Sequence, residues 1–217
     1  AEPGARHIAA TRRPPGSRPT KPETPSLARL EVLEHGVVYQ NPRPNLVSEY
    51  VAFPAVQVLA DGSAVCMCRH GSARERDDGV VRIHRSDDGG RTWSTAGALP
   101  EPDAVGVGMR LPGGFAVTTE DELLAWVCYP PAAGGSGAFV ARSTDGGCSW
   151  SEDLTAIDTS PWGRLGPGGN LAVLPDGALL AAAEHGQETD GGGLPAWSSL
   201  LCRSVDGGRN WEPWETV

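Results

Sequence analysis

The sequence predicts an all-β chain built from about three repeated, four-stranded antiparallel sheets. Three observations support this fold class: an eight-residue turn pattern occurs three times, its copies are almost evenly spaced, and the composition of 29 Gly and 19 Pro suits many short strands joined by turns. The copies occupy residues 86–93, 143–150 and 204–211.

The pattern reads Ser-x-Asp-Gly-Gly-x-polar-Trp, and an arginine precedes each copy. Its chemistry is that of a tight turn closing a β-hairpin: Asp accepts backbone N–H groups, the glycines adopt conformations barred to other residues, and Trp returns to the apolar side. The central aspartates are 57 and 61 residues apart, which indicates a repeated supersecondary unit. We therefore predict a structural role for Ser86, Asp88, Gly90, Trp93, Ser143, Asp145, Gly147, Trp150, Ser204, Asp206, Gly208 and Trp211.

Apolar runs between turn signals place the remaining elements. Each repeat is expected to contain a first turn around an acidic residue, namely Asp61, Asp121 and Asp176. The expected strands are 53–59, 64–68, 80–85 and the segment after Trp93 in the first repeat, 123–128 in the second, 171–174, 178–183 and 198–203 in the third, and a short leading strand at 36–40.

Charge is unevenly distributed along the chain. The net charge is −9, but residues 1–30 carry six Lys/Arg against two Asp/Glu. This basic, Pro-rich segment has almost no apolar residues and is predicted to be a disordered tail. The acidic remainder, residues 31–217, argues against a nucleic-acid partner. No stretch is apolar enough to span a membrane, and localisation cannot be read from the sequence.

The five cysteines do not suggest a disulfide framework, because they are few and odd in number. Cys66 and Cys68 share one face of a strand, but no further ligands at matching spacing accompany them, so buried free thiols are expected. His70 and His185 recur in register and are interpreted as strand-end residues, and His84 has no visible partner. We expect no metal and no cofactor.

The octet resembles the Asp box, or BNR repeat, of the sialidase (neuraminidase) superfamily, and the resemblance covers residues 36–217. It implies a sialidase-like β-propeller, of which three four-stranded blades are present. The family's propeller is six-bladed, which would require about 350 residues at this spacing. The missing blades are expected from further chain or from association. The same box also occurs in propellers that are not sialidases, so it indicates fold more strongly than activity.

A ligand face follows from the order of the strands. Alternate turns of a meander lie at opposite ends, so the octet turns share one face with the first turns of each repeat, and the other loops gather on the opposite face. Aligning the repeats on Asp61, Asp121 and Asp176 brings Arg69, Tyr129 and Glu184 into one row, and His70, Pro130 and His185 into the next. The polar residues expected to bind a glycan on that face are Arg69, His70, Arg74, Arg76, Glu184, His185, Arg164 and Trp197.

Catalytic roles rest on the resemblance alone. Sialidases bind a carboxylated sugar through an arginine cluster, and they use an Asp as acid and a Tyr assisted by a Glu as nucleophile. The resemblance makes Asp77 or Asp78 the candidate acid, whereas Ala52 stands where the family's first arginine belongs. The family's remaining arginines and its Tyr–Glu pair belong to later blades, which this sequence does not contain.

Three functions therefore remain open. The first is an exo-acting glycoside hydrolase on glycan ends, or a fragment of one. The second is a non-catalytic propeller that binds a glycan or a protein with the same face, and Ala52 favours it. The third is a structural repeat module within a larger secreted or surface protein.

Overall fold

The computed structural model describes residues 31–32, 34–74, 76–131, 137–159, 164–187 and 196–215. Contacts divide the chain into Ala1–Glu34 and His35–Val217, and all the strands belong to the second unit. The tail predicted at residues 1–30 lies outside the described residues. The described part of the chain contains no helix, and hence no helix able to cross a membrane.

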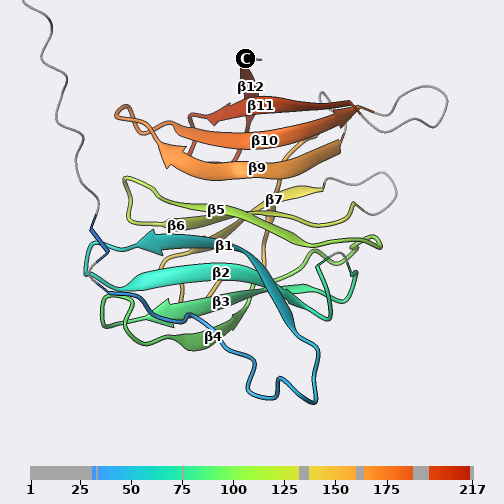
Figure 1. Cartoon of the computed structure of the whole chain (residues 1–217). Helices are drawn as coiled ribbons and strands as arrows, with labels where there is room; N and C mark the ends of the chain where they lie inside the picture. Colours follow the sequence, from blue (N-terminus) through green and yellow to red (C-terminus); the bar gives the residue numbers. More distant parts are fainter. Residues whose placement is uncertain are drawn as a thin grey trace, which may run out of the picture. The chain divides into compact units, whose positions relative to one another are not determined.

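In the described residues, twelve strands form three separate four-stranded antiparallel sheets, here called blades 1, 2 and 3 (Figure 1). In each blade the strands follow one another in sequence order, as in a meander. Blade 1 contains β1 (Tyr50–Val58), β2 (Ala64–Gly71), β3 (Val80–Ser86) and β4 (Ser94–Ala98). Blade 2 contains β5 (Leu111–Val117), β6 (Leu123–Cys128), β7 (Ala138–Ser143) and β8 (Thr155–Ala156). Blade 3 contains β9 (Arg164–Val173), β10 (Leu179–Gln187), β11 (Ala196–Ser204) and β12 (Glu212–Glu215).

The predicted strands are confirmed, although most extend further than the sequence indicated. The strand expected at 123–128 has the predicted bounds. The short strand expected at 36–40 was wrong, because this segment pairs with no strand. Its Tyr39 packs instead against His70 of blade 1, with ring centroids 4.6 Å apart, and donates a hydrogen bond to Glu49.

The core consists of two apolar seams between neighbouring blades. Side chains alternate across each strand, so Val65 and Met67 of blade 1 pack against blade 2, whereas Leu124 and Trp126 of blade 2 pack against blade 3. All six residues of β6 are buried because blade 2 has a blade on each side. The first strands β1, β5 and β9 also contact one another in series, the arrangement of blades around a common axis (Figure 1).

Each octet turn is held by its serine and aspartate. In the first copy, Ser86 Oγ accepts the Gly90 N–H at 2.8 Å and donates to Asp88 Oδ1 at 2.8 Å. The backbone N–H groups of Arg91 and Thr92 both donate to Asp88 Oδ1 at 2.9 Å. The serine and aspartate bonds recur in the other two copies, and the second glycine of each copy has a positive φ of 80° to 90°. In all three copies, therefore, the serine and aspartate side chains hold the backbone of the turn.

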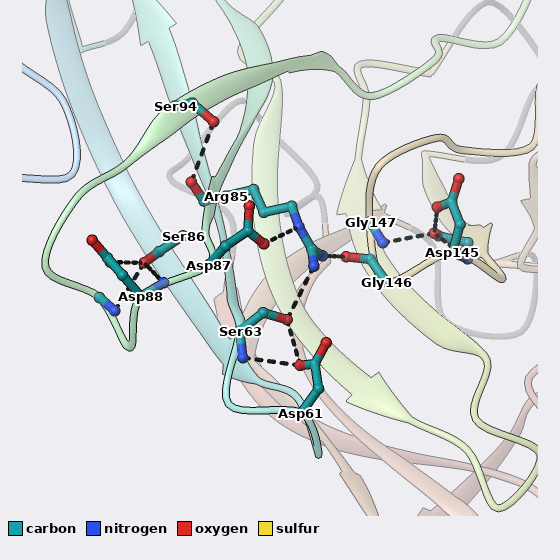
Figure 2. A network of polar contacts seen from close by, with 12 residues as sticks. Asp61, Ser63, Arg85, Ser86, Asp87, Asp88, Ser94, Asp145, Gly146 and Gly147 are labelled. Atoms are coloured by element: carbon teal, nitrogen blue, oxygen red, sulfur yellow. Dashed lines mark hydrogen bonds and ion pairs between the residues drawn. The ribbon is translucent and has the colours of Figure 1, made fainter.

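The arginines before the first two octets link neighbouring blades on the face that carries the octet turns. Arg85 donates to Ser63 in the first turn of its own blade, at 3.1 Å, and to the Gly146 carbonyl in the octet of blade 2 (Figure 2). Arg142 repeats the arrangement with Glu122 of its own blade and the Gly207 carbonyl of blade 3. The octet turns and the first turns therefore lie on one face, as predicted.

The octet aspartates make the fold sensitive to acid. Hydrogen bonds from Ser149 lower the pKa of Asp145 to about 2 from its usual 3.8. For Asp206, burial raises the pKa, but hydrogen bonds led by those from Asn210 outweigh it and bring the value to about 2. A carboxyl whose folded pKa lies below its unfolded pKa stabilises the fold above the unfolded value and loses that contribution as pH falls through the folded value. The stabilisation is thus complete above about pH 4 and disappears towards about pH 2.

We therefore predict that the thermal midpoint of the wild-type chain falls between about pH 4 and pH 2. Asp145→Asn should have a lower midpoint at neutral pH and a smaller further drop in acid, because the amide does not titrate over this range. Thermal unfolding followed by circular dichroism at several pH values measures both. Equal acid dependence in the two proteins would contradict the role given to the Asp145 carboxylate.

Candidate functional site

The face opposite the octet turns collects the β2–β3 loop and the crossing between blades 1 and 2. Arg110, at the end of that crossing, donates from Nη1 to the Asp77 carbonyl oxygen in the β2–β3 loop at 2.7 Å. The same crossing reaches blade 2, where the Gly106 N–H donates to the Pro130 carbonyl at 2.9 Å and Val105 forms a β-bridge with Pro131. Hydrogen bonds therefore join this crossing both to the β2–β3 loop and to the segment that follows β6.

Arg69 lies beneath the β2–β3 loop instead of on its surface. The side chain is fully buried, and its guanidinium donates to the carbonyl oxygens of Ala73, at 2.9 Å, and Arg76. Gly79 leaves the space for it, because a Cβ there would lie 2.3 Å from Arg69 Cζ. The substrate contact predicted for Arg69 is corrected: burial leaves no guanidinium N–H to meet a ligand, and the residue fixes the loop.

A second arginine supports the loop from the side. Arg110 forms a two-point ion pair with Glu101, with Nε to Oε1 at 2.8 Å and Nη2 to Oε2 at 3.2 Å. Its remaining Nη1 holds the Asp77 carbonyl described above. Glu101 was missed by the sequence analysis, because a lone Glu after a Leu-Pro pair carries no periodic signal.

The two candidate acids are exposed and differ in their surroundings. Asp78 accepts the Ser72 N–H through both carboxylate oxygens, at 3.2 and 3.3 Å. This hydrogen bonding lowers its pKa, and Arg69 and Arg76 add to the effect. A general acid needs a raised pKa. The lowered pKa of Asp78 favours its ionised form, so this residue is poorly suited to donate a proton. The Asp77 carboxylate is exposed at the edge of the loop.

Arg74 and Arg76 are the exposed cations of this loop. The guanidinium of Arg74 lies over the ring of Phe53, 5.6 Å from its centroid. Phe53 belongs to an irregularity in β1 and has a φ of 56°, a conformation uncommon for an aromatic residue. The exposed Arg74 and Arg76 thus lie on the same loop as Asp77 and Asp78.

Blade 3 contributes its predicted residues at the ends of its strands. Glu184 is exposed on β10 and pairs with Gly166 and Ser199. Arg164 and Trp197 both pair with Gly186, one from each neighbouring strand, and His185 precedes it. Among the described residues, no hydrogen bond or ion pair links Glu184 with the β2–β3 loop. The ligand contacts predicted in blade 3 stay predictions.

The alignment of the middle repeat was wrong by one residue. Asp121 has a φ of 61° and takes the place of Gly62 and Gly177, whose φ values are 85° and 82°. Glu120 is therefore the counterpart of Asp61 and Asp176. Tyr129, instead of Pro130, shares the row of His70 and His185, and Cys128 shares the row of Arg69 and Glu184.

His70 is also not on the loop surface. It is 3% exposed and lies on the side of blade 1 that faces away from blade 2, in contact with Glu49 and His84. The glycan contact predicted for it is corrected, because neighbouring side chains surround its imidazole. The sequence analysis missed Glu49 and His84; the alternation that puts Cys66, Cys68 and His70 on one face of a strand was the available signal.

Comparison with known proteins supports the architecture. No family model and no curated protein matches the chain. A solved protein of unknown function from Dyadobacter fermentans superposes with a TM-score of 0.60 at 21% identity, over 84% of this chain and 57% of that one. A Hadza microbial sialidase gives a TM-score of 0.60 at 19% identity, over 77% of this chain and 37% of that one.

The chain is a partial β-propeller. An α-L-arabinofuranosidase from Fusarium graminearum, solved with an iminosugar inhibitor, matches with a TM-score of 0.53 at 15% identity, over 74% of this chain and 49% of that one. The chain thus spans between about a third and just over half the length of these structures. At such identities the likeness establishes the propeller fold and nothing finer.

Proposed function

We propose that the loop face of these blades binds the end of a glycan, as part of a glycoside hydrolase-like propeller related to the sialidases. The observation that carries the proposal is that two arginine side chains hold the backbone of the β2–β3 loop in place through hydrogen bonds. Arg69 holds the carbonyls of Ala73 and Arg76 from below, and Arg110 holds that of Asp77 from the side. A loop fixed in this way loses little conformational freedom when a ligand binds.

The exposed groups of this loop suit an acidic or polyhydroxylated sugar. Arg74 and Arg76 offer guanidinium groups, which pair with a carboxylate through two parallel hydrogen bonds. The Asp-box resemblance of the octets and the propeller fold support the same substrate class. Asp77 is the candidate acid of such an enzyme, since Asp78 is held in its ionised form.

A non-catalytic binding propeller is the second candidate, and Ala52 favours it. This residue stands where the sialidase pattern has its first arginine, and it pairs with the buried Arg69. The neighbouring guanidinium is committed to backbone carbonyls, so it does not replace the missing one.

Hydrolysis of a fluorogenic sialoside, together with binding to a panel of immobilised acidic and neutral glycans, tests both functions. Turnover above background that Asp77→Asn abolishes supports the hydrolase. Glycan binding without turnover supports the second candidate. A folded protein that neither binds a glycan nor turns over the sialoside would contradict the proposal.

The double variant Arg74→Ala/Arg76→Ala should bind an acidic glycan about tenfold or more weakly, because each charge-assisted hydrogen bond contributes about 1.5–3 kcal/mol. Titration calorimetry measures the change. Arg209→Ala removes an exposed arginine from the octet face and should bind as the wild type does. Equal weakening in both variants would point to bulk charge, and no weakening in the double variant would place the ligand elsewhere.

A further inference from the structure

A cluster of nitrogen and sulfur donors is buried on the side of blade 1 that faces away from blade 2. Cys68 and His70 lie two residues apart on β2, and His84 reaches the same point from β3. Their exposed fractions are 2%, 3% and 1%. His70 Nε2 lies 3.4 Å from Cys68 Sγ and 3.0 Å from His84 Nε2, and the three donor atoms all lie within 4.8 Å of one another.

Hydrogen-bond partners at the Nδ1 atom of each imidazole orient the two histidine rings. Glu49 Oε1 lies 2.9 Å from His70 Nδ1 and holds a proton there, and Glu49 itself accepts a hydrogen bond from the Tyr39 hydroxyl at 2.7 Å. Thr95 Oγ1 lies 3.2 Å from His84 Nδ1. The Nε2 atoms are left to face each other and the thiol. A carboxylate on the outer nitrogen of an imidazole is the usual support of a metal-binding histidine.

Hydrogen bonds alone satisfy this cluster poorly. With its Nδ1 proton directed at Glu49, His70 offers a single Nε2 lone pair, yet both Cys68 Sγ and His84 Nε2 approach it. One cation placed among the three atoms accepts a lone pair from each. A tetrahedral zinc ion has ligand edges of about 3.3 Å between nitrogens and about 3.6 Å between nitrogen and sulfur, close to the separations here.

The other blades show that packing does not require these residues. With the repeats aligned on Gly62, Asp121 and Gly177, the positions of Cys68 and His84 in blade 2 are Val127 and Ala141, both in the apolar seam. In blade 3 they are Ala183 and Cys202, again in a seam. Blade 3 does repeat a histidine, His185, at the position of His70, and blade 2 has Tyr129 there. The combination of all three donors is therefore particular to blade 1.

We propose that Cys68, His70 and His84 bind a zinc-class divalent cation, with Glu49 and Thr95 orienting the imidazoles. The mixture of one thiolate and two imidazoles suits zinc and disfavours calcium or magnesium, which take oxygen ligands. Three protein ligands leave the fourth position of a tetrahedral ion to water. A hollow of about 480 Å³, lined by Tyr39, Glu49, His70, Ser72 and Arg82 among others, gives the ion a route to the cluster.

The proposed metal site shares no ligand residue with the proposed glycan-binding loop, and metal binding is measured independently of glycan binding.

To test the proposal, the full-length chain is stripped of metal with a chelator, dialysed and loaded with Zn²⁺ or Co²⁺. We expect about one zinc per chain, and with cobalt a thiolate-to-metal charge-transfer band together with the intense visible bands of a tetrahedral ion. A folded wild-type chain that binds no zinc above background and shows no cobalt–thiolate band overturns the proposal, whatever the variants do.

Variants then assign the ligands. Cys68→Ser should abolish the charge-transfer band, and His84→Ala should weaken zinc binding strongly. Cys202→Ser, which removes a buried thiol of blade 3, and His35→Ala, which removes an exposed histidine, should bind as the wild type does. Zinc should raise the thermal midpoint of the wild type and of both controls, but not that of Cys68→Ser. Unchanged binding in Cys68→Ser would overturn the assignment.

Glu49→Gln tests the supporting role of the carboxylate. It should weaken zinc binding about 10–100-fold while the circular dichroism spectrum and the charge-transfer band of the loaded protein remain. A residue that merely stabilised the fold would lower the thermal midpoint of the metal-free protein without changing the dissociation constant. That outcome would contradict the role given to Glu49.

Discussion

Trp126→Ala is expected to lower the free energy of unfolding by about 3–5 kcal/mol, the range for a large buried aromatic residue in a core. The indole is fully buried in the seam between blades 2 and 3, where it meets Trp211 edge-on with ring centroids 5.5 Å apart. The residues around the indole have little freedom to move into the cavity that the substitution would create. A Cβ on Gly113 would lie 2.1 Å from Trp126 Cδ1, so the backbone of β5 is already packed against the ring.

Urea denaturation followed by circular dichroism measures the loss. Trp126→Phe provides the matched control, because it retains a ring and removes the indole N–H, which has no hydrogen-bond partner among the described residues. It should therefore cost clearly less than alanine. Trp214→Ala removes a tryptophan that is 42% exposed and should change stability little. Similar losses at positions 126 and 214 would contradict the placement of the core in the seams.

The sequence predicted the blades because their signals are local. The octet turns depend on contacts within eight residues, such as Ser86 with Asp88, so a pattern of eight letters determines their geometry. The middle blade was misaligned because an aspartate adopts the positive φ that glycine marks in the other two blades. Asp121 reads as the counterpart of Asp61, whereas its backbone is the counterpart of Gly62.

The candidate sites were predicted less well because their contacts are distant in sequence. Glu49 and His70 are 21 residues apart, and Tyr39 comes from a segment that was predicted to be a strand. Arg69 was expected on the surface, since a charged residue near a strand end is usually exposed. The carbonyls of its own loop and the space left by Gly79 allow it to be buried instead, and neither feature has a sequence pattern.

Arg142→Ala is expected to lower the free energy of unfolding by about 2–4 kcal/mol, because its guanidinium joins two blades. Nη1 donates to Glu122 Oε2 at 2.8 Å and to the Gly207 carbonyl oxygen at 2.9 Å, and the two ion-paired side chains are only 13% and 22% exposed. Removing the arginine leaves the Glu122 carboxylate and a carbonyl of the neighbouring octet turn without their donor. The change should appear in the urea midpoint and as faster hydrogen exchange in the turn of residues 204–211.

Arg203 provides the matched control, because it precedes the third octet in the same register. It pairs with Asp176 in the first turn of its own blade, at 2.9 Å, but in the described part of the chain it meets no octet of a following blade. Arg203→Ala should therefore cost less than Arg142→Ala, with Arg85→Ala close to the latter because Arg85 also reaches the next octet. If all three variants lost the same stability, the arginines would act within their own blades, and the bond to the neighbouring octet would contribute nothing. The expected ranking instead assigns the additional stability to the contact that couples one blade to the next.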